Sequence, residues 1–256
     1  MIHKTAIVDS STVLGDGVEI GPYSIIGPKV IIGDNTKIDA HVIVKGPTEI
    51  GKRCSISPFS SIGEIPQDLK FKGEDTKLII GDDNLIREYV TINRGTQEGR
   101  GITSIGDHNF FMAYTHIAHD CNISNHVIMA NGATLAGHIS IHEFAILGGL
   151  VAVHQFVTIG RNAFIGGCSA VSQDIPPFCL AAGNRARLHG LNLTGLKRAG
   201  IPSDTIRNLK KAYRIIFRSG LALKEGIIQA RQSINDSPEV DHLIEFIQES
   251  KRGIHR

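Results

Sequence analysis

The 256-residue sequence contains no tryptophan, and only 5% of its residues are aromatic. Its four cysteines form no C-x-x-C pair, so neither a structural zinc site nor a disulfide framework is expected. No apolar run approaches the ~18 residues that a membrane-spanning helix needs, and Met1 does not begin a signal-peptide pattern. These absences predict a soluble, cytoplasmic protein without an integral membrane segment.

Positive and negative charges nearly balance, because the formal net charge is only +2. This balance argues against nucleic-acid binding. The charge is nevertheless uneven. Residues 1–182 hold 13 Lys and Arg against 18 Asp and Glu, whereas residues 183–256 hold 14 against 7. The basic C-terminal part could attract an acidic protein or a phosphate-bearing ligand, or could simply be a solvated helical surface.

A repeat of six residues dominates the first two thirds of the chain. Every sixth position from Ile2 to Ile62 is aliphatic; the register breaks at 64–79, resumes from Ile80 to Ile92, breaks at 93–104, and runs again from Ile105 to Val171. A period of six matches neither a helix nor an alternating strand, but fits a short strand plus a corner, with three units closing a coil of 18 residues. Glycine or aspartate often follows the aliphatic residue, where we expect unusual φ angles at the corner.

Helical spacing replaces the repeat in the C-terminal part. Residues 200–220 carry Pro202 and Ser203 at the start, apolar residues at helical intervals and Gly220 at the stop. Residues 222–234 and 238–250 predict two more helices. We therefore expect a β-helix over 1–183, with inserted loops near 64–79 and 93–104, followed by a helical domain over 184–256.

The segment THIAHDC (115–121) places His116 and His119 beside an inward-facing isoleucine, so both histidines should point outward. A step of 18 residues stacks His119 against Gly137, whose N–H could be exposed, and then against Gln155. The same step stacks Asp120 against His138. The predicted corner thus gathers a polar column, made of His119, Asp120, His138, His154 and Gln155.

Three interpretations of this column remain open: solvent-exposed histidines, a zinc site, or a general base. Imidazoles suit zinc, but an adjacent aspartate is typical of a pair in which the carboxylate orients a catalytic histidine. We favour general-base catalysis by His119, with Asp120 fixing its tautomer and no metal. The sequence carries no G-x-S-x-G, P-loop or Rossmann motif, and no partner pattern for a cysteine nucleophile.

The repeat resembles that of the hexapeptide-repeat acyltransferases, and within this class the sequence resembles the UDP-N-acetylglucosamine O-acyltransferases of lipid A synthesis. The segments that carry the likeness are SIGEIPQDLKFKGE (61–74), TINRGT (91–96), THIAHDC (115–121), NGATLAGH (131–138), AVHQF (152–156), IGGCS (165–169) and GLKRAG (195–200). This resemblance implies an all-β left-handed parallel β-helix followed by a small α-helical domain. It also implies a homotrimer that transfers a 3-hydroxyacyl chain from acyl carrier protein to the glucosamine 3-hydroxyl of UDP-N-acetylglucosamine, without a cofactor.

The resemblance further implies roles for individual residues. His119 would be the base, Asp120 its partner, and the Gly137 N–H the oxyanion donor. Gly167 matches a position that limits acyl-chain depth, and Arg198 would bind phosphate. Substrate contacts are implied for Gln67, Asp68, Lys70, Asn93, His116, His138, His154, Gln155, Gly167, Asn192 and Arg198. Asn93 and Arg185 stand where relatives often carry histidine, so these two positions depart from the pattern.

Other activities also fit the sequence. The sibling N-acyltransferase of the same pathway usually has an extra domain before its β-helix, whereas here the repeats begin at residue 2. A coenzyme-A-dependent acetyltransferase, a metal-dependent hydratase and a non-catalytic scaffold remain alternatives. The sequence does not determine the acyl length, or whether the acceptor carries a hydroxyl or an amino group.

Overall fold

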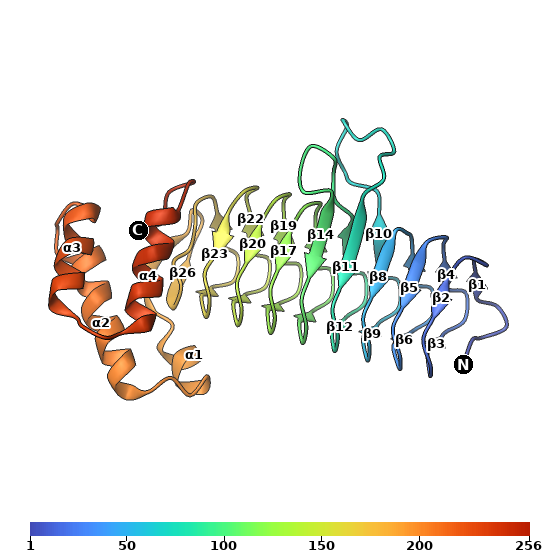
Figure 1. The fold of residues 1–256 in the computed structure, drawn as a ribbon, viewed down its shortest axis with the longest axis horizontal. Helices are drawn as coiled ribbons and strands as arrows, with labels where there is room; N and C mark the ends of the chain where they lie inside the picture. Colours follow the sequence, from blue (N-terminus) through green and yellow to red (C-terminus); the bar gives the residue numbers. More distant parts are fainter.

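A computed structural model describes residues 1–256 as a long triangular prism of stacked coils that ends in a cluster of helices (Figure 1). The strands form three parallel sheets, which we call faces 1, 2 and 3 in the order in which the chain visits them. Most strands have two residues, the first pointing outward and the second inward, because side chains alternate along a strand.

Face 1 has nine strands and face 2 has eight. Face 1 contains β1 (Ile7–Val8), β4 (Ile25–Ile26), β7 (Ile43–Val44), β10 (Ser61–Glu64), β13 (Thr91–Asn93), β16 (His116–Ile117), β19 (Thr134–Leu135), β22 (Ala152–Val153) and β25 (Ala170–Val171). Face 2 contains β2 (Val13–Leu14), β5 (Val30–Ile32), β8 (Thr48–Ile50), β11 (Lys77–Ile80), β14 (Ile102–Ile105), β17 (Asn122–Ile123), β20 (Ser140–Ile141) and β23 (Thr158–Ile159).

Face 3 has ten strands, of which only the last pair is antiparallel. It contains β3 (Glu19–Ile20), β6 (Lys37–Ile38), β9 (Ser55–Ile56), β12 (Leu85–Ile86), β15 (Phe110–Phe111), β18 (Ile128–Met129), β21 (Ile146–Leu147), β24 (Phe164–Ile165), β26 (Cys179–Ala182) and β27 (Arg187–Leu191). The predicted domain boundary at residue 183 falls between β26 and β27, two strands of this one sheet.

The strand register confirms the 18-residue coil. Ile117 pairs with Leu135, and Leu135 pairs with Val153, so the inward residues form a column through the prism. From Ile20 to Val171 the aliphatic position of the repeat is buried in a single continuous core. Each such side chain contributes roughly 1.5–3 kcal/mol of burial, which the coils obtain only by stacking on one another.

The expected reason for glycine at the corners is wrong. The left-handed conformation falls three residues after the inward aliphatic, where Asp120 has φ 59° and His138 has φ 61°. Except for Gly63, which has φ 77°, the glycines directly after the aliphatic have no left-handed φ. They lie against the next coil: a Cβ on Gly33 would come within 2.7 Å of the Gly51 carbonyl carbon. Close backbone approach, and not φ, therefore requires glycine there.

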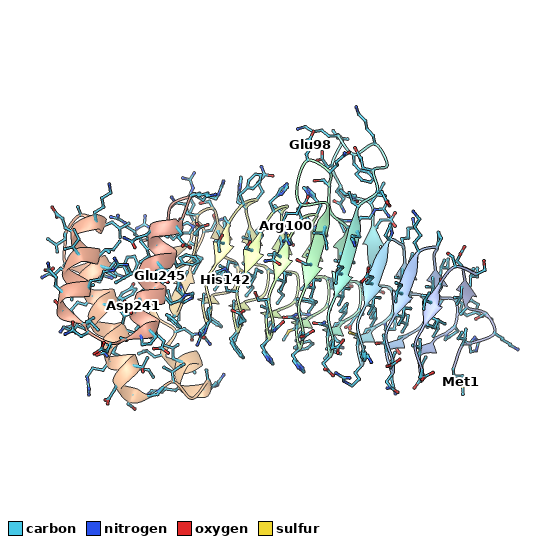
Figure 2. All side chains as sticks on the ribbon, in the orientation of Figure 1. Met1, Glu98, Arg100, His142, Asp241 and Glu245 are labelled. Carbon is cyan, nitrogen blue, oxygen red and sulfur yellow. The ribbon has the colours of Figure 1, made fainter.

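The two predicted insertions leave the prism as neighbouring loops between β10 and β11 and between β13 and β14, and Glu98 lies in this projecting part (Figures 1 and 2). The three predicted helices are confirmed as α2 (Ser203–Arg218), α3 (Leu223–Ser233) and α4 (Pro238–Glu249); α1 (Leu193–Arg198) was not predicted. None of the four helices combines the length and apolarity that crossing a bilayer requires.

Candidate active site

His119 and Asp120 lie at the edge where face 1 turns into face 2, between β16 and β17. The His119 Nδ1 and Asp120 Oδ2 atoms are 2.8 Å apart. The Asp120 side chain is completely buried, whereas the His119 side chain is 15% exposed. Because a carboxylate only accepts hydrogen bonds, the proton of the neutral imidazole sits on Nδ1 and the Nε2 lone pair is left free.

The second inserted loop holds the Asp120 carboxylate in place. The backbone N–H and the hydroxyl of Thr96 both donate to it, the hydroxyl at 2.6 Å from Oδ2, and the backbone N–H of Arg100 donates to Oδ1 at 2.8 Å. Gly99 passes so close to this carboxylate that a Cβ there would collide with it. The loop therefore closes over the aspartate and removes its freedom to turn away from His119.

These contacts keep Asp120 ionised. Burial by itself raises the pKa of Asp120, but the hydrogen bonds from Thr96, His119 and Arg100 outweigh it, and the resulting pKa is below the ordinary value of 3.8. An anionic partner at Nδ1 stabilises the imidazolium that forms when His119 takes a proton.

Gly137 faces the other side of the His119 ring, as the 18-residue step predicts. A Cβ built on Gly137 would lie 2.5 Å from Cε1 and 2.7 Å from Nε2 of His119. The Gly137 N–H donates no hydrogen bond within the chain. A free proton acceptor and a free backbone donor thus adjoin one another at this edge.

Two further histidines surround the pair. The His138 ring meets the His119 ring edge-on at 5.0 Å and stacks on Phe156 at 4.6 Å, and His116 Nδ1 lies 2.7 Å from Thr91 Oγ1. Desolvation by burial lowers the pKa of His138 more than the nearby Asp120 carboxylate raises it, and desolvation together with the proximity of His119 lowers the pKa of His116. Both rings are therefore neutral at neutral pH and add no positive charge next to the base.

His119, Asp120 and His138 also offer one ligand atom each within 4.8 Å of one another, which matches the spacing of a metal site. However, Asp120 Oδ2 already accepts hydrogen bonds from Thr96 and is bonded to His119 Nδ1. A metal ion on this carboxylate would have to displace the donors that orient it. The hydrogen-bond pattern therefore favours the base over the metal site.

The cysteines offer no alternative nucleophile at this edge. Cys121 follows Asp120 directly, but burial raises the pKa of its thiol to about 12, and burial also raises the pKa of Cys54 and Cys179. A buried, protonated thiol is a poor nucleophile. Cys168 is exposed, and it lies on a different edge of the prism.

The remaining predicted residues are spread over several parts of the fold. His154 and Gln155 are exposed on the same edge as His119, two coils further along. Gln67, Asp68 and Lys70 lie in the first inserted loop, where Lys70 Nζ is 3.2 Å from Glu98 Oε2 of the second loop. This ion pair is exposed and joins the two loops next to the edge.

Asn93 lies beneath the first inserted loop. It is only 2% exposed, and its Nδ2 donates to the Ile65 carbonyl at 2.9 Å. An amide in this position anchors the first inserted loop from below, which an uncharged side chain can do. Within one chain Asn93 has this structural role, and its substrate contact stays a prediction.

Gly167, Asn192 and Arg198 lie elsewhere in the chain. Gly167 is exposed on the edge between faces 3 and 1. Asn192 is buried, where its Oδ1 caps α1 and its Nδ2 donates to the Asn162 carbonyl. Asn192 and Arg198 line a cavity of about 640 Å³ between α1 and the outer surface of face 3. A single chain therefore does not bring these three residues to the edge that carries His119.

Sequence reasoning missed Thr96, Arg100 and Thr103. The Thr103 hydroxyl accepts the Asp120 N–H at 2.8 Å, so all three residues hold the aspartate. The available signal was the broken register over 93–104 with its three glycines, Gly95, Gly99 and Gly101, which indicates a loop pressed against the prism. The six-residue period does not show that this loop contacts Asp120.

Replacing Thr96 with valine should reduce both stability and activity. The loss of one donor to a buried carboxylate costs ~1–3 kcal/mol of unfolding free energy. Turnover should fall about tenfold, equivalent to ~1.4 kcal/mol, because Asp120 orients the base less firmly. Urea unfolding and kcat measure the two effects.

The matched control is Thr96→Ser, which keeps the hydroxyl. The pKa of Asp120 is depressed in the folded state, so its contribution to stability is present above the ordinary value of 3.8 and is lost as the pH falls through the folded-state pKa. The stability gap between Thr96→Val and the wild type should therefore narrow in acid. A valine variant as stable and active as the serine variant would contradict this role.

Comparison with known proteins agrees with this geometry. Residues 29–64 match the family described as bacterial transferase hexapeptide (six repeats), and residues 174–255 match the family described as UDP N-acetylglucosamine O-acyltransferase, domain 2. A solved structure from Acinetobacter baumannii is 46% identical with a TM-score of 0.97, covering 100% of this chain and 99% of that one. One from Bacteroides fragilis is 41% identical with a TM-score of 0.98, covering both chains completely.

The repeats, the three-faced prism and the paired histidine and aspartate at its edge define a hexapeptide-repeat acyltransferase, and the predicted left-handed β-helix with a helical C-terminal part is confirmed. Two relatives, from Thermodesulfovibrio yellowstonii and Syntrophobacter fumaroxidans, are 56% and 52% identical over 255 and 256 residues, which is 100% of this chain and 99% of each relative. Both are named acyl-(acyl-carrier-protein)–UDP-N-acetylglucosamine O-acyltransferase. The chain belongs to this family of UDP-N-acetylglucosamine O-acyltransferases.

Proposed function

We propose that the protein transfers a 3-hydroxyacyl chain from acyl carrier protein to the glucosamine 3-hydroxyl of UDP-N-acetylglucosamine, the first step of lipid A synthesis. The observation that carries this proposal is the free Nε2 of His119 beside the free N–H of Gly137. The named activity of the relatives supports the choice of donor and acceptor.

The reaction follows from these two groups. His119 Nε2 takes the proton of the sugar hydroxyl as its oxygen attacks the thioester carbonyl carbon. The negative charge that develops on the carbonyl oxygen is accepted by the Gly137 N–H. When the C–S bond breaks, the imidazolium returns its proton to the thiolate of the carrier. A general base of this kind is worth ~10²–10⁴ in rate, and one oxyanion donor ~10²–10³.

The separation of the candidate residues within one chain supports a homotrimer as the working unit. His119 occupies the edge between faces 1 and 2, whereas the Arg198 cavity lies on face 3. Packing the edge of one chain against face 3 of the next would bring a base and a nucleotide-binding cavity together. We propose a cytoplasmic enzyme in this form, with the basic helical part docking the acidic carrier protein.

Mixed trimers test this arrangement. His119→Ala and Arg198→Ala should each be inactive alone, but activity should reappear when the two variants are unfolded together and reassembled. In a mixed trimer, an intact edge from one chain can meet an intact cavity from another. Reassembly of each variant by itself is the control. Persistent inactivity of mixtures that form trimers would show that both residues serve one chain's own site.

The product mass tests the activity itself. The protein is incubated with UDP-N-acetylglucosamine and a mixed pool of acyl carrier thioesters, with coenzyme A thioesters in a parallel reaction. We expect a single 3-hydroxyacyl addition that requires the carrier and survives removal of metal ions by a chelator. Acylation only from coenzyme A, or stoichiometric zinc bound through histidine, would favour the competing activities.

A further inference from the structure

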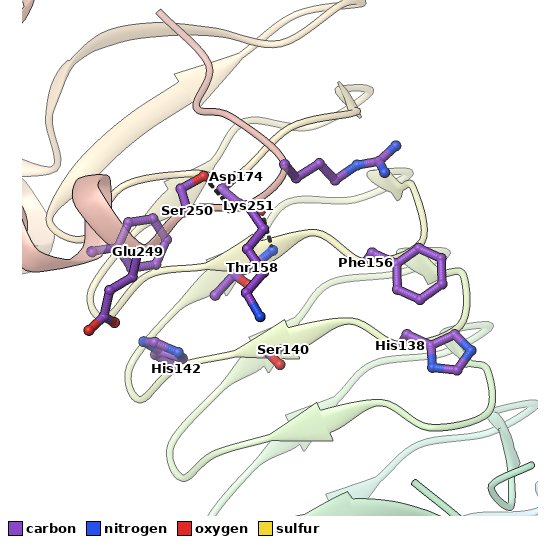
Figure 3. A pocket seen from close by; sticks show the side chains of 11 residues that line it. His138, Ser140, His142, Phe156, Thr158, Asp174, Glu249, Ser250 and Lys251 are labelled. Atoms are coloured by element: carbon purple, nitrogen blue, oxygen red, sulfur yellow. Dashed lines mark hydrogen bonds between the residues drawn. The ribbon is translucent and has the colours of Figure 1, made fainter. Parts of the chain in front are cut away.

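The segment after α4, residues 250–256, is fastened to the last coil of the β-helix. The Ser250 hydroxyl donates to Asp174 Oδ2 at 2.6 Å, a bond drawn in Figure 3. The Asp174 N–H donates to the Gly253 carbonyl at 2.9 Å, and the His255 N–H donates to the Asp174 carbonyl at 3.0 Å. The segment is thus held at three points by one residue of the coil.

His255 adds a fourth point of attachment beyond Arg252. Its Nε2 accepts the backbone N–H groups of Ser172 and Gln173, each at 3.1 Å. Burial lowers the pKa of His255, so the ring stays neutral and Nε2 can accept. Arg252 is consequently fixed on both sides, by Ser250 before it and by His255 after it.

The Arg252 guanidinium connects this anchored segment to the candidate active site. Its Nε donates to the Ser172 carbonyl at 2.8 Å, and its Nη2 lies 2.8 Å from Nδ1 of His154. A guanidinium has only donors, so His154 Nδ1 must be the acceptor and the ring proton sits on Nε2. Nδ1 also lies 3.2 Å from the Gln155 carbonyl, which would need the opposite tautomer. The shorter contact, which the charged guanidinium makes, determines the tautomer of His154.

We propose that Arg252 is a positioning residue that holds His154 as the Nε2–H tautomer, so that the ring donates a hydrogen bond to an oxygen of the nucleotide sugar. This inference rests on the proposed function for the identity of that oxygen-rich ligand. His154 is exposed on the edge that carries His119, and His138 and Phe156 of the same edge line the cavity of about 710 Å³ that Arg252 borders (Figure 3).

His119 and His154 are held in opposite tautomers, which gives them different chemical roles. Asp120 receives the Nδ1 proton of His119 and leaves a lone pair on Nε2, which makes a base. Arg252 occupies the Nδ1 lone pair of His154 and leaves a proton on Nε2, which makes a donor. His154 can therefore hold a substrate oxygen without competing with His119 for the proton of the sugar hydroxyl.

The ring nitrogens of His154 test the tautomer directly and without substrate. In the full-length protein with ¹⁵N-labelled histidine, His154 is assigned by its disappearance in His154→Gln. We expect Nε2 to carry the proton and Nδ1 to be unprotonated in the wild type, and Arg252→Gln to give a mixture of tautomers. Lys251→Gln, which alters the neighbouring exposed charge, should leave the signals unchanged.

Kinetics then link the tautomer to the reaction. In Arg252→Gln the KM for UDP-N-acetylglucosamine should rise ~10-fold or more, as expected for a lost charge-assisted hydrogen bond, with kcat within about threefold of wild type. Guanidinium ion should lower the KM of Arg252→Ala again. Unchanged ring signals in Arg252→Gln, or an unchanged KM, would overturn the proposal. A wild type that shows the expected tautomer yet fails to acylate UDP-N-acetylglucosamine would instead refute the proposed function.

Discussion

Replacing His119 with alanine is expected to lower kcat by ~10²–10⁴-fold while changing the KM for UDP-N-acetylglucosamine little. The imidazole supplies the only lone pair beside the Gly137 N–H that is backed by a buried carboxylate. Without it, water or a poorly placed neighbour must take the proton from the sugar hydroxyl. Steady-state kinetics with saturating donor separate the two constants.

Folding should survive this change. Asp120 keeps its donors from Thr96 and Arg100, so its buried charge does not become unpaired. Added imidazole should restore part of the activity by binding in the space left open. His41→Ala is the matched control, because His41 is an exposed edge histidine stacked between Tyr23 and Phe59 on a different edge. Turnover of His119→Ala within threefold of wild type would mean that another group is the base.

The second large effect is expected from Gly137→Ala, which keeps the backbone N–H but should reduce kcat/KM by ~10²-fold or more, because the added methyl group displaces the His119 ring and a general base is worth ~10²–10⁴ in rate. The new methyl group would lie 2.5 Å from the His119 ring, closer than real carbon contacts allow. The ring, as a side chain, can tilt aside, so activity should suffer much more than stability. Thermal unfolding measured together with kcat/KM distinguishes these outcomes.

Gly27→Ala provides the comparison for this prediction. Its Cβ would meet the Val44 carbonyl at 3.3 Å on a distant coil, which is tight but tolerable. We expect a small loss of stability and unchanged kinetics for this variant. If Gly137→Ala retained wild-type kcat/KM, the position of the His119 ring against Gly137 would not matter to the reaction.

The β-helix explains why two short strands and a turn can hold a base so firmly. Each corner repeats the same backbone on the coils above and below it, so Asp120, His138 and Phe156 adopt nearly the same left-handed φ, between 59° and 66°. Side chains at this position form a column, and those one residue earlier form another. A site built this way needs little rearrangement when substrate arrives, which is the basis of electrostatic preorganisation.

Much of the site could be predicted because, in a stack of equal coils, the spacing of two residues in the sequence gives their relative positions in space. The six-residue period determines which side chains face inward, and the 18-residue step places Gly137 against His119 and His138 beside Asp120. Such inference works where each coil contacts only its neighbours, because distance in space then follows from distance in sequence.

The tertiary structure alone decided what occurs where the register breaks and where distant segments meet. Thr96 closes on Asp120, Asn93 lies under the first loop, and Arg252 reaches His154 from nearly a hundred residues away. No periodicity relates these partners, since loops and a chain terminus are placed by packing and hydrogen bonds that depend on the whole fold. Periodicity alone therefore predicts the prism and its polar edge, whereas the folded chain places the groups that hold each imidazole and so determines which one can accept a proton.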